Sequence, residues 1–183
     1  KLLNSSANEK TNFLEALDGK RISSGPSGAP TRGKLEVLPT GKNFFSVDIR
    51  AIPTETAWDL GKRSAEQIMA LYLQENGEHL SHLAISIWGT STMRNGGEDI
   101  CQLFALMGLR PIWDGTLRRV VDVEVIPLSV LNRPRVDVTL RISGLFRDAF
   151  PQIIELIRRG QNLIGNLKES CSINPLAESY RNG

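Results

Sequence analysis

The chain has 183 residues, of which 40% are apolar and 23% charged, and its formal net charge is +2. This composition is typical of a globular domain and excludes a disordered or fibrous chain, while no apolar run approaches the roughly 20 residues of a membrane span. Lysine and arginine form no block, so we expect no nucleic-acid partner. Cys101 and Cys171 lack the CxxC spacing of a thiolate metal site or a disulfide framework, which favours a reducing compartment, the cytoplasm.

The N-terminal part of the chain has a weak pattern. Its first residues include neither an initiator methionine nor a signal-peptide pattern, so we expect the chain to begin inside a longer protein. The apolar spacing over residues 13–17 predicts a short helix that ends at Gly19, and residues 22–39 are rich in turn formers, which predicts irregular structure. We therefore expect an irregular segment with a short helix over residues 1–35 and an α/β domain over residues 36–183.

The middle of the chain alternates between helix and strand patterns. Thr54 is a good N-cap for an apolar series that runs to Gly77, which predicts the longest helix. Residues 82–88 are a short apolar run with the length of a buried parallel strand. A glycine-rich loop over residues 89–97 is expected to lead into a helix over residues 100–107.

The C-terminal third continues this alternation. Strands are predicted at residues 111–113, 120–126 and 136–142. A helix is expected over residues 145–167, with Pro151 in its first turns or at a kink. Strands that alternate with helices predict an α/β fold, a mostly parallel β-sheet flanked by helices in a Rossmann-like layered architecture.

Two strand-to-helix crossings are candidates for a ligand site, because open parallel sheets bind ligands beyond the carboxyl ends of their strands. They cover residues 88–99 and 141–148. Their hydroxyls, glycines and arginines suit a carboxylate or a phosphate, although the first contains neither the Walker lysine spacing nor GxGxxG. Trp88 abuts the first crossing and could pack on a flat macrocycle or belong to the core. The alternative is that both crossings are well-capped helices.

Other polar residues have structural explanations beside functional ones. Glu98 and Asp99 suit acid–base chemistry, yet acids in the first turn of a helix are also favoured by its dipole. His79 and His82 have no third ligand beside them, so we expect surface residues. Cys101 is expected to be a buried, inert thiol. The sequence has no Ser-His-Asp order, nucleophile elbow or phosphate-binding lysine motif that would indicate a hydrolase or a kinase.

Six runs of sequence resemble signatures of the large, tetrapyrrole-binding subunit of aerobic cobaltochelatase and of the porphyrin-binding subunit of magnesium chelatase. Together they extend over nearly all of the chain after about residue 13, and we interpret the chain as an internal fragment of a subunit of this family. The runs are GPSGAPTRG at 25–33, LPTGKNFFSVD at 38–48, SIWGTSTMR at 86–94, GLRPIWD at 108–114, RPRVDVTL at 133–140 and RISGLFRDAFP at 141–151.

Two details favour the cobalt branch of the family: the TLRISG run that ends in RDAFP at residues 139–151, and the Trp-Asp pair at residues 113–114. Three mild departures from the family pattern are Leu145 for Phe, Asn95 for Thr and Glu98 for Asp.

The resemblance implies a very large multidomain subunit, a component of an ATP-dependent metal chelatase. It would hold hydrogenobyrinic acid a,c-diamide for Co²⁺ insertion in cobalamin biosynthesis, with ATP bound on AAA+ ATPase partners and with integrin-I-type subunits in the complex. In the magnesium branch, the metal is Mg²⁺ and the ring is protoporphyrin. The family's motif rich in histidine and glutamate has no match here, so we expect this fragment to hold no metal and to be inactive alone.

The resemblance also places candidate site residues. Those expected to contact the tetrapyrrole are Lys42, Asn43, Trp88, Thr90, Met93, Arg94, Ser143 and Arg147. The three basic ones would bind the acid or amide side chains of the ring, since a guanidinium fork suits a carboxylate. Asp48 and Asp148 are the candidates for catalysis by proton removal; equally, they could anchor the arginines.

Three hypotheses about function remain. The first is the cobaltochelatase large subunit, the second is the porphyrin-binding subunit of magnesium chelatase, and the third is a non-catalytic tetrapyrrole-binding scaffold descended from them.

Overall fold

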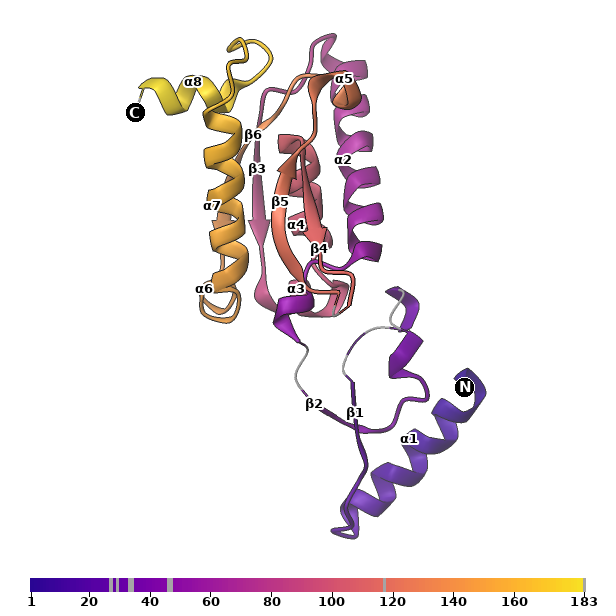
Figure 1. Ribbon diagram of the computed structural model, residues 1–183. Coiled ribbons are helices and arrows are strands. Elements are labelled where there is room, and N and C mark those ends of the chain that lie inside the picture. Colours follow the sequence, from indigo (N-terminus) through magenta and orange to yellow (C-terminus); the bar gives the residue numbers. More distant parts are fainter. Residues whose placement is uncertain (27, 29, 33–34, 46–47, 117, 183) are drawn as a thin grey trace. The chain divides into compact units, whose positions relative to one another are not determined.

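A computed structural model describes residues 1–26, 28, 30–32, 35–45, 48–116 and 118–182 of the chain (Figure 1). The chain divides into two compact units, Lys1–Asp48 and Ile49–Gly183. The domain boundary expected after residue 35 stays a prediction. Parts of the two N-terminal signature runs, namely Ser27, Ala29, Gly33, Ser46 and Val47, lie outside the described residues.

The first unit holds one long helix and two short strands. Its elements are α1 (Leu2–Leu17), β1 (Ser24–Pro26), the 3₁₀ helices η1 (Pro30–Arg32) and η2 (Leu35–Val37), and β2 (Asn43–Phe45). Strands β1 and β2 pair in parallel, with Ser24 opposite Asn43. Helix α1 begins well before the residues whose spacing predicted a helix, and none of its residues is buried.

The LPTGKN run is fixed against α1. The backbone of Gly41 has a φ of +84°, and a Cβ there would lie 2.6 Å from the backbone nitrogen of Glu9. Asn12 donates a hydrogen bond of 2.6 Å to the Gly41 carbonyl, and the Thr40 N–H donates to the Ser5 hydroxyl at 3.1 Å. Glycine is required at position 41 both for its conformation and for the close approach of the helix.

The second unit contains the remaining elements. In chain order they are η3 (Ile49–Ala51), α2 (Glu55–Asn76), β3 (His82–Ile87), α3 (Gly89–Asn95), α4 (Glu98–Met107), β4 (Leu109–Trp113), β5 (Val120–Val125), α5 (Leu128–Leu131), β6 (Asp137–Ile142), α6 (Gly144–Ala149), α7 (Pro151–Gly165) and α8 (Pro175–Asn182).

The strands confirm the α/β class, a parallel sheet with flanking helices. Strands β3 and β6 pair in parallel over six residues, from His82 opposite Asp137 to Ile87 opposite Ile142. Strands β4 and β5 instead form an antiparallel hairpin. Their connection over residues 114–119 is too short for the crossover that parallel strands need.

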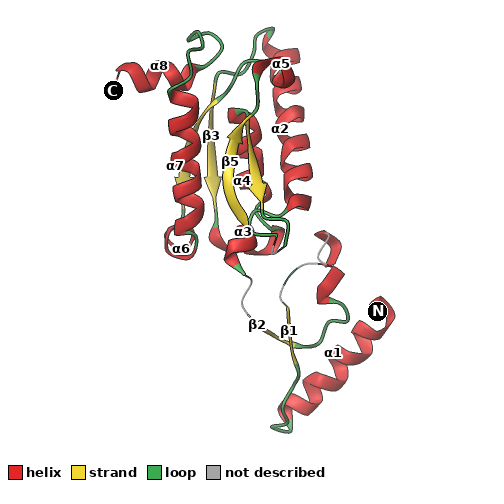
Figure 2. Ribbon diagram, in the orientation of Figure 1, coloured by secondary structure: helices red, strands yellow, loops and turns green. Residues whose placement is uncertain are grey.

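Helix α4 is the centre of the packing. Seven of the ten residues of α4 are buried, and α2 and β4 both pack against it. Figure 1 shows β3, β4 and β5 between α7 and α2, and Figure 2 shows these strands in yellow among the red helices. Helix α2 approaches α4 at Gly61, where a Cβ would lie 2.6 Å from the Cβ of Cys101.

Two expected elements differ from the structure. The glycine-rich stretch expected to be a loop is the helix α3, whose C-cap is Gly96 with a φ of +76°, and Gly97 is the N-cap of α4 with a φ of +91°. The helix expected over residues 145–167 is two helices, α6 and α7. Phe150 separates them at φ −127° and ψ 48°, because Pro151 at the start of α7 disfavours a helical residue before it.

Candidate functional site

The carboxyl ends of β3 and β6 lie side by side, and a helix follows each of them directly. Trp88 is the N-cap of α3 and Ser143 is the N-cap of α6. The Ser143 N–H donates to the Ile87 carbonyl at 3.1 Å, and its hydroxyl accepts hydrogen bonds from the N–H groups of Gly89 and Phe146, both at 3.2 Å. One serine side chain therefore ties the two helix starts together.

Gly89 permits this arrangement. A Cβ at Gly89 would lie 2.9 Å from both the Leu145 Cγ and the Phe146 nitrogen. The first turn of α3 thus lies against the first turn of α6, and both predicted crossings belong to one surface.

Apolar side chains are exposed on this surface. Trp88 is 62% exposed, Leu145 49% and Ile142 37%. Single exposed apolar residues are ordinary, but a cluster of them at a strand end marks a surface that is suited to an apolar ligand or partner.

Polar candidates flank the apolar cluster. Thr90, Met93 and Arg94 stand at helical spacing, so they share one face of α3, where Thr90 and Arg94 are exposed. Arg147 is exposed on α6 and donates through Nε to Asp148 at 2.9 Å. This hydrogen bond and the charge of Asp148 raise the pKa of Arg147, so its guanidinium stays cationic.

Three of the candidate residues, Lys42, Asn43 and Asp48, belong to the first unit. Lys42 and Asn43 line an open cavity of about 780 Å³ together with Phe13 of α1 and Arg21. Lys42 also packs its aliphatic stem over Gly25, where a Cβ would clash with it. Asp48 is the last residue of this unit, and its side chain is exposed.

The corner between α3 and α4 is held by hydrogen bonds of Asn95, to which the sequence pattern assigned no role, and of the Thr54 backbone. The buried side chain of Asn95 accepts hydrogen bonds from the N–H groups of Gly97 at 2.9 Å and Glu98 at 3.3 Å. The Thr54 N–H donates to the Gly96 carbonyl at 3.0 Å. Asn95, the last residue of α3, therefore accepts from the first N–H groups of the α4 start, which fixes the end of the helix that carries Arg94.

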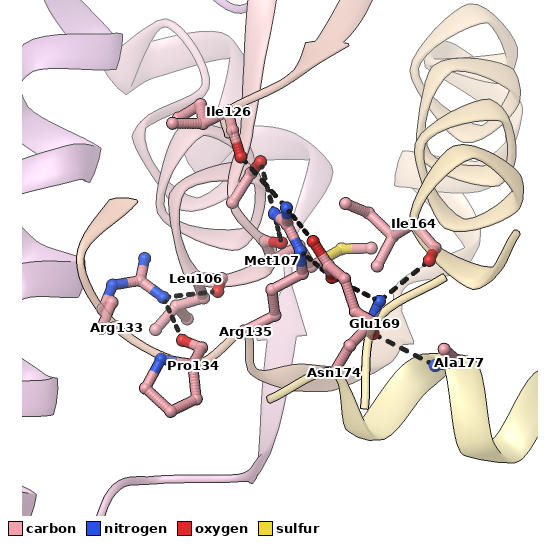
Figure 3. A network of polar contacts seen from close by, with 11 residues as sticks. Leu106, Met107, Ile126, Arg133, Pro134, Arg135, Ile164, Glu169, Asn174 and Ala177 are labelled. Atoms are coloured by element: carbon pink, nitrogen blue, oxygen red, sulfur yellow. Dashed lines mark hydrogen bonds and ion pairs between the residues drawn. The ribbon is translucent and has the colours of Figure 1, made fainter. Parts of the chain in front are cut away.

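Two arginines close the other end of α4 (Figure 3). Arg133 donates to the carbonyls of Ala105 and Leu106. Arg135 is 1% exposed and donates to the carbonyls of Met107, at 3.3 Å, and Gly108, at 3.1 Å. Burial lowers the pKa of Arg133 to about 10, and the charge of Arg135 adds to the shift, but at neutral pH Arg133 remains a cation. They satisfy carbonyls that a helix end leaves without a partner.

The histidines and cysteines of the described residues lie at separate places in the fold. Among the described residues, no group of three His, Cys, Asp or Glu side chains could hold a metal ion. His82 is exposed on β3, and His79 lines a cavity of about 730 Å³ between α2 and the segment that follows β5. Cys101 is buried, and burial, followed by the charges of Glu98, Asp59 and Asp99, raises the pKa of its thiol. Within the described part of the chain, none of the helices is both long and apolar enough to cross a membrane.

Comparison with known proteins identifies the class of protein. The sequence pattern of the family described as CobN/Magnesium Chelatase matches residues 1–183, and the chain belongs to this family of metal chelatase subunits.

Individual relatives refine this assignment. The chain is 53% identical over 169 residues to the aerobic cobaltochelatase subunit CobN of Pseudomonas aeruginosa, covering 92% of the chain and 14% of that relative. It is 36% identical over 168 residues to the magnesium-chelatase subunit ChlH of Oryza sativa subsp. japonica, covering 91% of the chain and 12% of the relative. The chain therefore spans about one seventh or less of these relatives.

A solved structure shares the fold. The chain matches the catalytic subunit of cobaltochelatase from Mycobacterium tuberculosis with a TM-score of 0.85 and 44% identity, over 97% of this chain and 15% of that one. The resemblance to the family of cobaltochelatase and magnesium-chelatase subunits is thus confirmed.

Proposed function

We propose that the chain is part of the large subunit of a cobaltochelatase, and that this subunit holds a tetrapyrrole while Co²⁺ is inserted. The observation that carries the proposal is the sequence identity over nearly the whole chain. This identity is 53% to the cobaltochelatase subunit CobN and only 36% to the magnesium-chelatase subunit ChlH.

The surface at the ends of β3 and β6 supports a role in holding the ring. A tetrapyrrole has a flat apolar face with acid or amide groups at its edge. The exposed indole of Trp88 and the side chain of Leu145 offer apolar contact, and the guanidinium of Arg147 offers a fork for a carboxylate. Asp148 orients Arg147 in this proposal and removes no proton itself, because its carboxylate already accepts from the guanidinium.

The remaining parts of the reaction belong to the rest of the complex. We propose hydrogenobyrinic acid a,c-diamide as the ring, with ATP hydrolysed on AAA+ partner subunits that work with integrin-I-type subunits in the cytoplasm. Lys42 and Asn43 contribute in this proposal through the cavity of the first unit, and Asp48 is kept as a candidate for proton removal.

The first test is an absorbance titration of the intact subunit with hydrogenobyrinic acid a,c-diamide and, separately, with protoporphyrin. Tighter binding of the former is expected. A preference for protoporphyrin would move the assignment to magnesium chelatase, and binding of neither would favour a scaffold.

A second test addresses the site. Arg94→Ala and Arg147→Ala in the intact subunit are each expected to weaken tetrapyrrole binding about ten- to a hundredfold, because a hydrogen bond to a charged group contributes about 1.5–3 kcal/mol. Arg63→Ala is the matched control, since Arg63 is an exposed arginine on α2. If both test variants bind the tetrapyrrole with unchanged affinity, the ring does not bind at this surface.

A further inference from the structure

Strand β6 has an open edge. Among the described residues its only strand partner is β3. The Asp137 N–H donates to the Ser81 carbonyl at 2.8 Å, and the Ser143 N–H donates to the Ile87 carbonyl at 3.1 Å. Successive N–H groups of a strand point to opposite sides. The N–H groups of the alternate residues Val138, Leu140 and Ile142 therefore point away from β3.

A groove runs along this edge. Its volume is about 390 Å³, and β6 forms one wall. Helix α7 forms the other wall with Ile154, Ile157, Arg158 and Gln161. A segment that entered the groove would meet both a row of backbone hydrogen-bonding groups and apolar side chains.

Two strands are an unusual size for a parallel sheet. Parallel sheets are ordinarily covered on both faces and have more strands, and an edge with unpaired N–H and C=O groups is a template for another strand. The face opposite the buried residues is also open, since Ala84, Ser86, Thr139 and Arg141 are exposed.

We propose that the open edge of β6 pairs with a β-strand from the part of the large subunit that lies outside this chain. We infer this occupant from the length of the relatives. The chain spans 14% of the cobaltochelatase subunit it resembles, so most of such a subunit is available to supply the strand. The strand places alternate apolar side chains against Ile154 and Ile157 and bonds its backbone to Val138, Leu140 and Ile142. This inference rests on the proposed function only in that the chain is part of such a subunit.

Hydrogen exchange on the intact subunit, resolved to single residues, tests the pairing. The amides of Thr139 and Arg141 are internal controls, because by the same alternation they face β3. The expected result is that the amides of Val138, Leu140 and Ile142 exchange within about tenfold of these controls. Exchange about a thousandfold faster at the three outward amides would overturn the proposal, because it would mean that they face solvent.

Dilution separates the two possible occupants. Protection by a strand of the same subunit is independent of concentration, whereas protection by a second copy would disappear as the subunit is diluted, and this would also overturn the proposal. The result is independent of the ring titration. If the β6 amides are protected but no tetrapyrrole binds, only the proposed ligand is rejected. If a tetrapyrrole binds but the β6 amides are unprotected, only the strand pairing is rejected.

Discussion

Arg135 and Glu169 form a bidentate ion pair, with Nε to Oε2 at 2.8 Å and Nη2 to Oε1 at 3.0 Å, and the arginine is 1% exposed. The two residues are 34 positions apart in the sequence. Their contact connects the end of α4 to the segment that precedes α8.

Replacement of this arginine by an apolar side chain tests the ion pair. Arg135→Met is expected to destabilise the protein by about 3–5 kcal/mol, because it removes one partner of a buried pair together with the hydrogen bonds that Arg135 donates to the carbonyls of Met107, Gly108 and Ile126. Arg159→Met is the matched control, since its pair with Asp122 is largely exposed; that change should cost less than about 1 kcal/mol. Urea unfolding of both variants measures the difference in the free energy of unfolding. Similar losses of stability would show that the buried ion pair contributes no more than the exposed one.

The contact between α2 and α4 predicts a strict requirement for glycine. Gly61→Ala is expected to cost about 1–3 kcal/mol, because the new Cβ would lie 2.6 Å from the Cys101 Cβ and from the backbone nitrogen of Gln102. Gly115→Ala should be close to neutral, since nothing lies within 4 Å of a Cβ there. Thermal unfolding of the two variants makes the comparison, and equal melting temperatures would contradict the close approach.

The buried thiol predicts a pH dependence. Burial raises the pKa of Cys101, so the folded protein keeps a proton that the unfolded chain releases above about pH 9. Because the folded state then binds more protons, the thiol's contribution to stability is complete below that pH and is lost as the pH rises, by up to about 1.4 kcal/mol per pH unit. Unfolding measured between pH 8 and 10.5 should show a shallower decline in Cys101→Ala than in the parent.

The same burial predicts which cysteine reacts. Iodoacetamide should modify Cys171, which is partly exposed, while Cys101 stays unmodified until urea unfolds the chain. Mass spectrometry of the peptides distinguishes the two sites. Modification of Cys101 at a rate comparable to Cys171 under native conditions would mean that α4 opens readily.

Ser143 is expected to contribute to stability apart from any ligand. Ser143→Ala removes the acceptor of the Gly89 and Phe146 N–H groups and should cost about 1–2 kcal/mol. Ser143→Thr keeps the hydroxyl and should recover most of the loss. If the alanine variant unfolds at the same temperature as the parent, the hydroxyl does not hold the two helix starts together.

Local signals in the sequence predicted the elements that have clear ends. Thr54 caps α2 by accepting from the Ala57 N–H at 3.1 Å, and Gly77 ends the helix with a φ of +73°. Both are residues whose chemistry acts within one turn. The strand predicted over residues 82–88 is β3, which pairs in parallel as expected.

The wrong expectation for residues 89–97 and the missed role of Arg135 both arise from tertiary contacts, whereas the split of the helix expected over residues 145–167 is a local effect of Pro151. The composition of residues 89–97 predicts a loop, but Gly89 is needed for the approach of α6, and the buried Thr92 donates its hydroxyl to the Trp88 carbonyl at 3.0 Å. Arg135 had no assigned role because its partners lie far away in the sequence, and the periodicity of a sequence does not indicate such long-range contacts. For the candidate site, the sequence identified the two crossings, but the serine hydroxyl that joins them required coordinates.

The arginine network at the end of α4 limits where the subunit can be shortened. Asn174 donates to Glu169 at 2.9 Å and to the Ile164 carbonyl at 3.0 Å, and it accepts from the Ala177 N–H at 3.1 Å. A truncation before Glu169 would remove the counter-ion of the buried Arg135 guanidinium, although Arg135 lies 34 positions away in the sequence. An expression boundary for this unit therefore belongs beyond Ala177, even though the strands end much earlier.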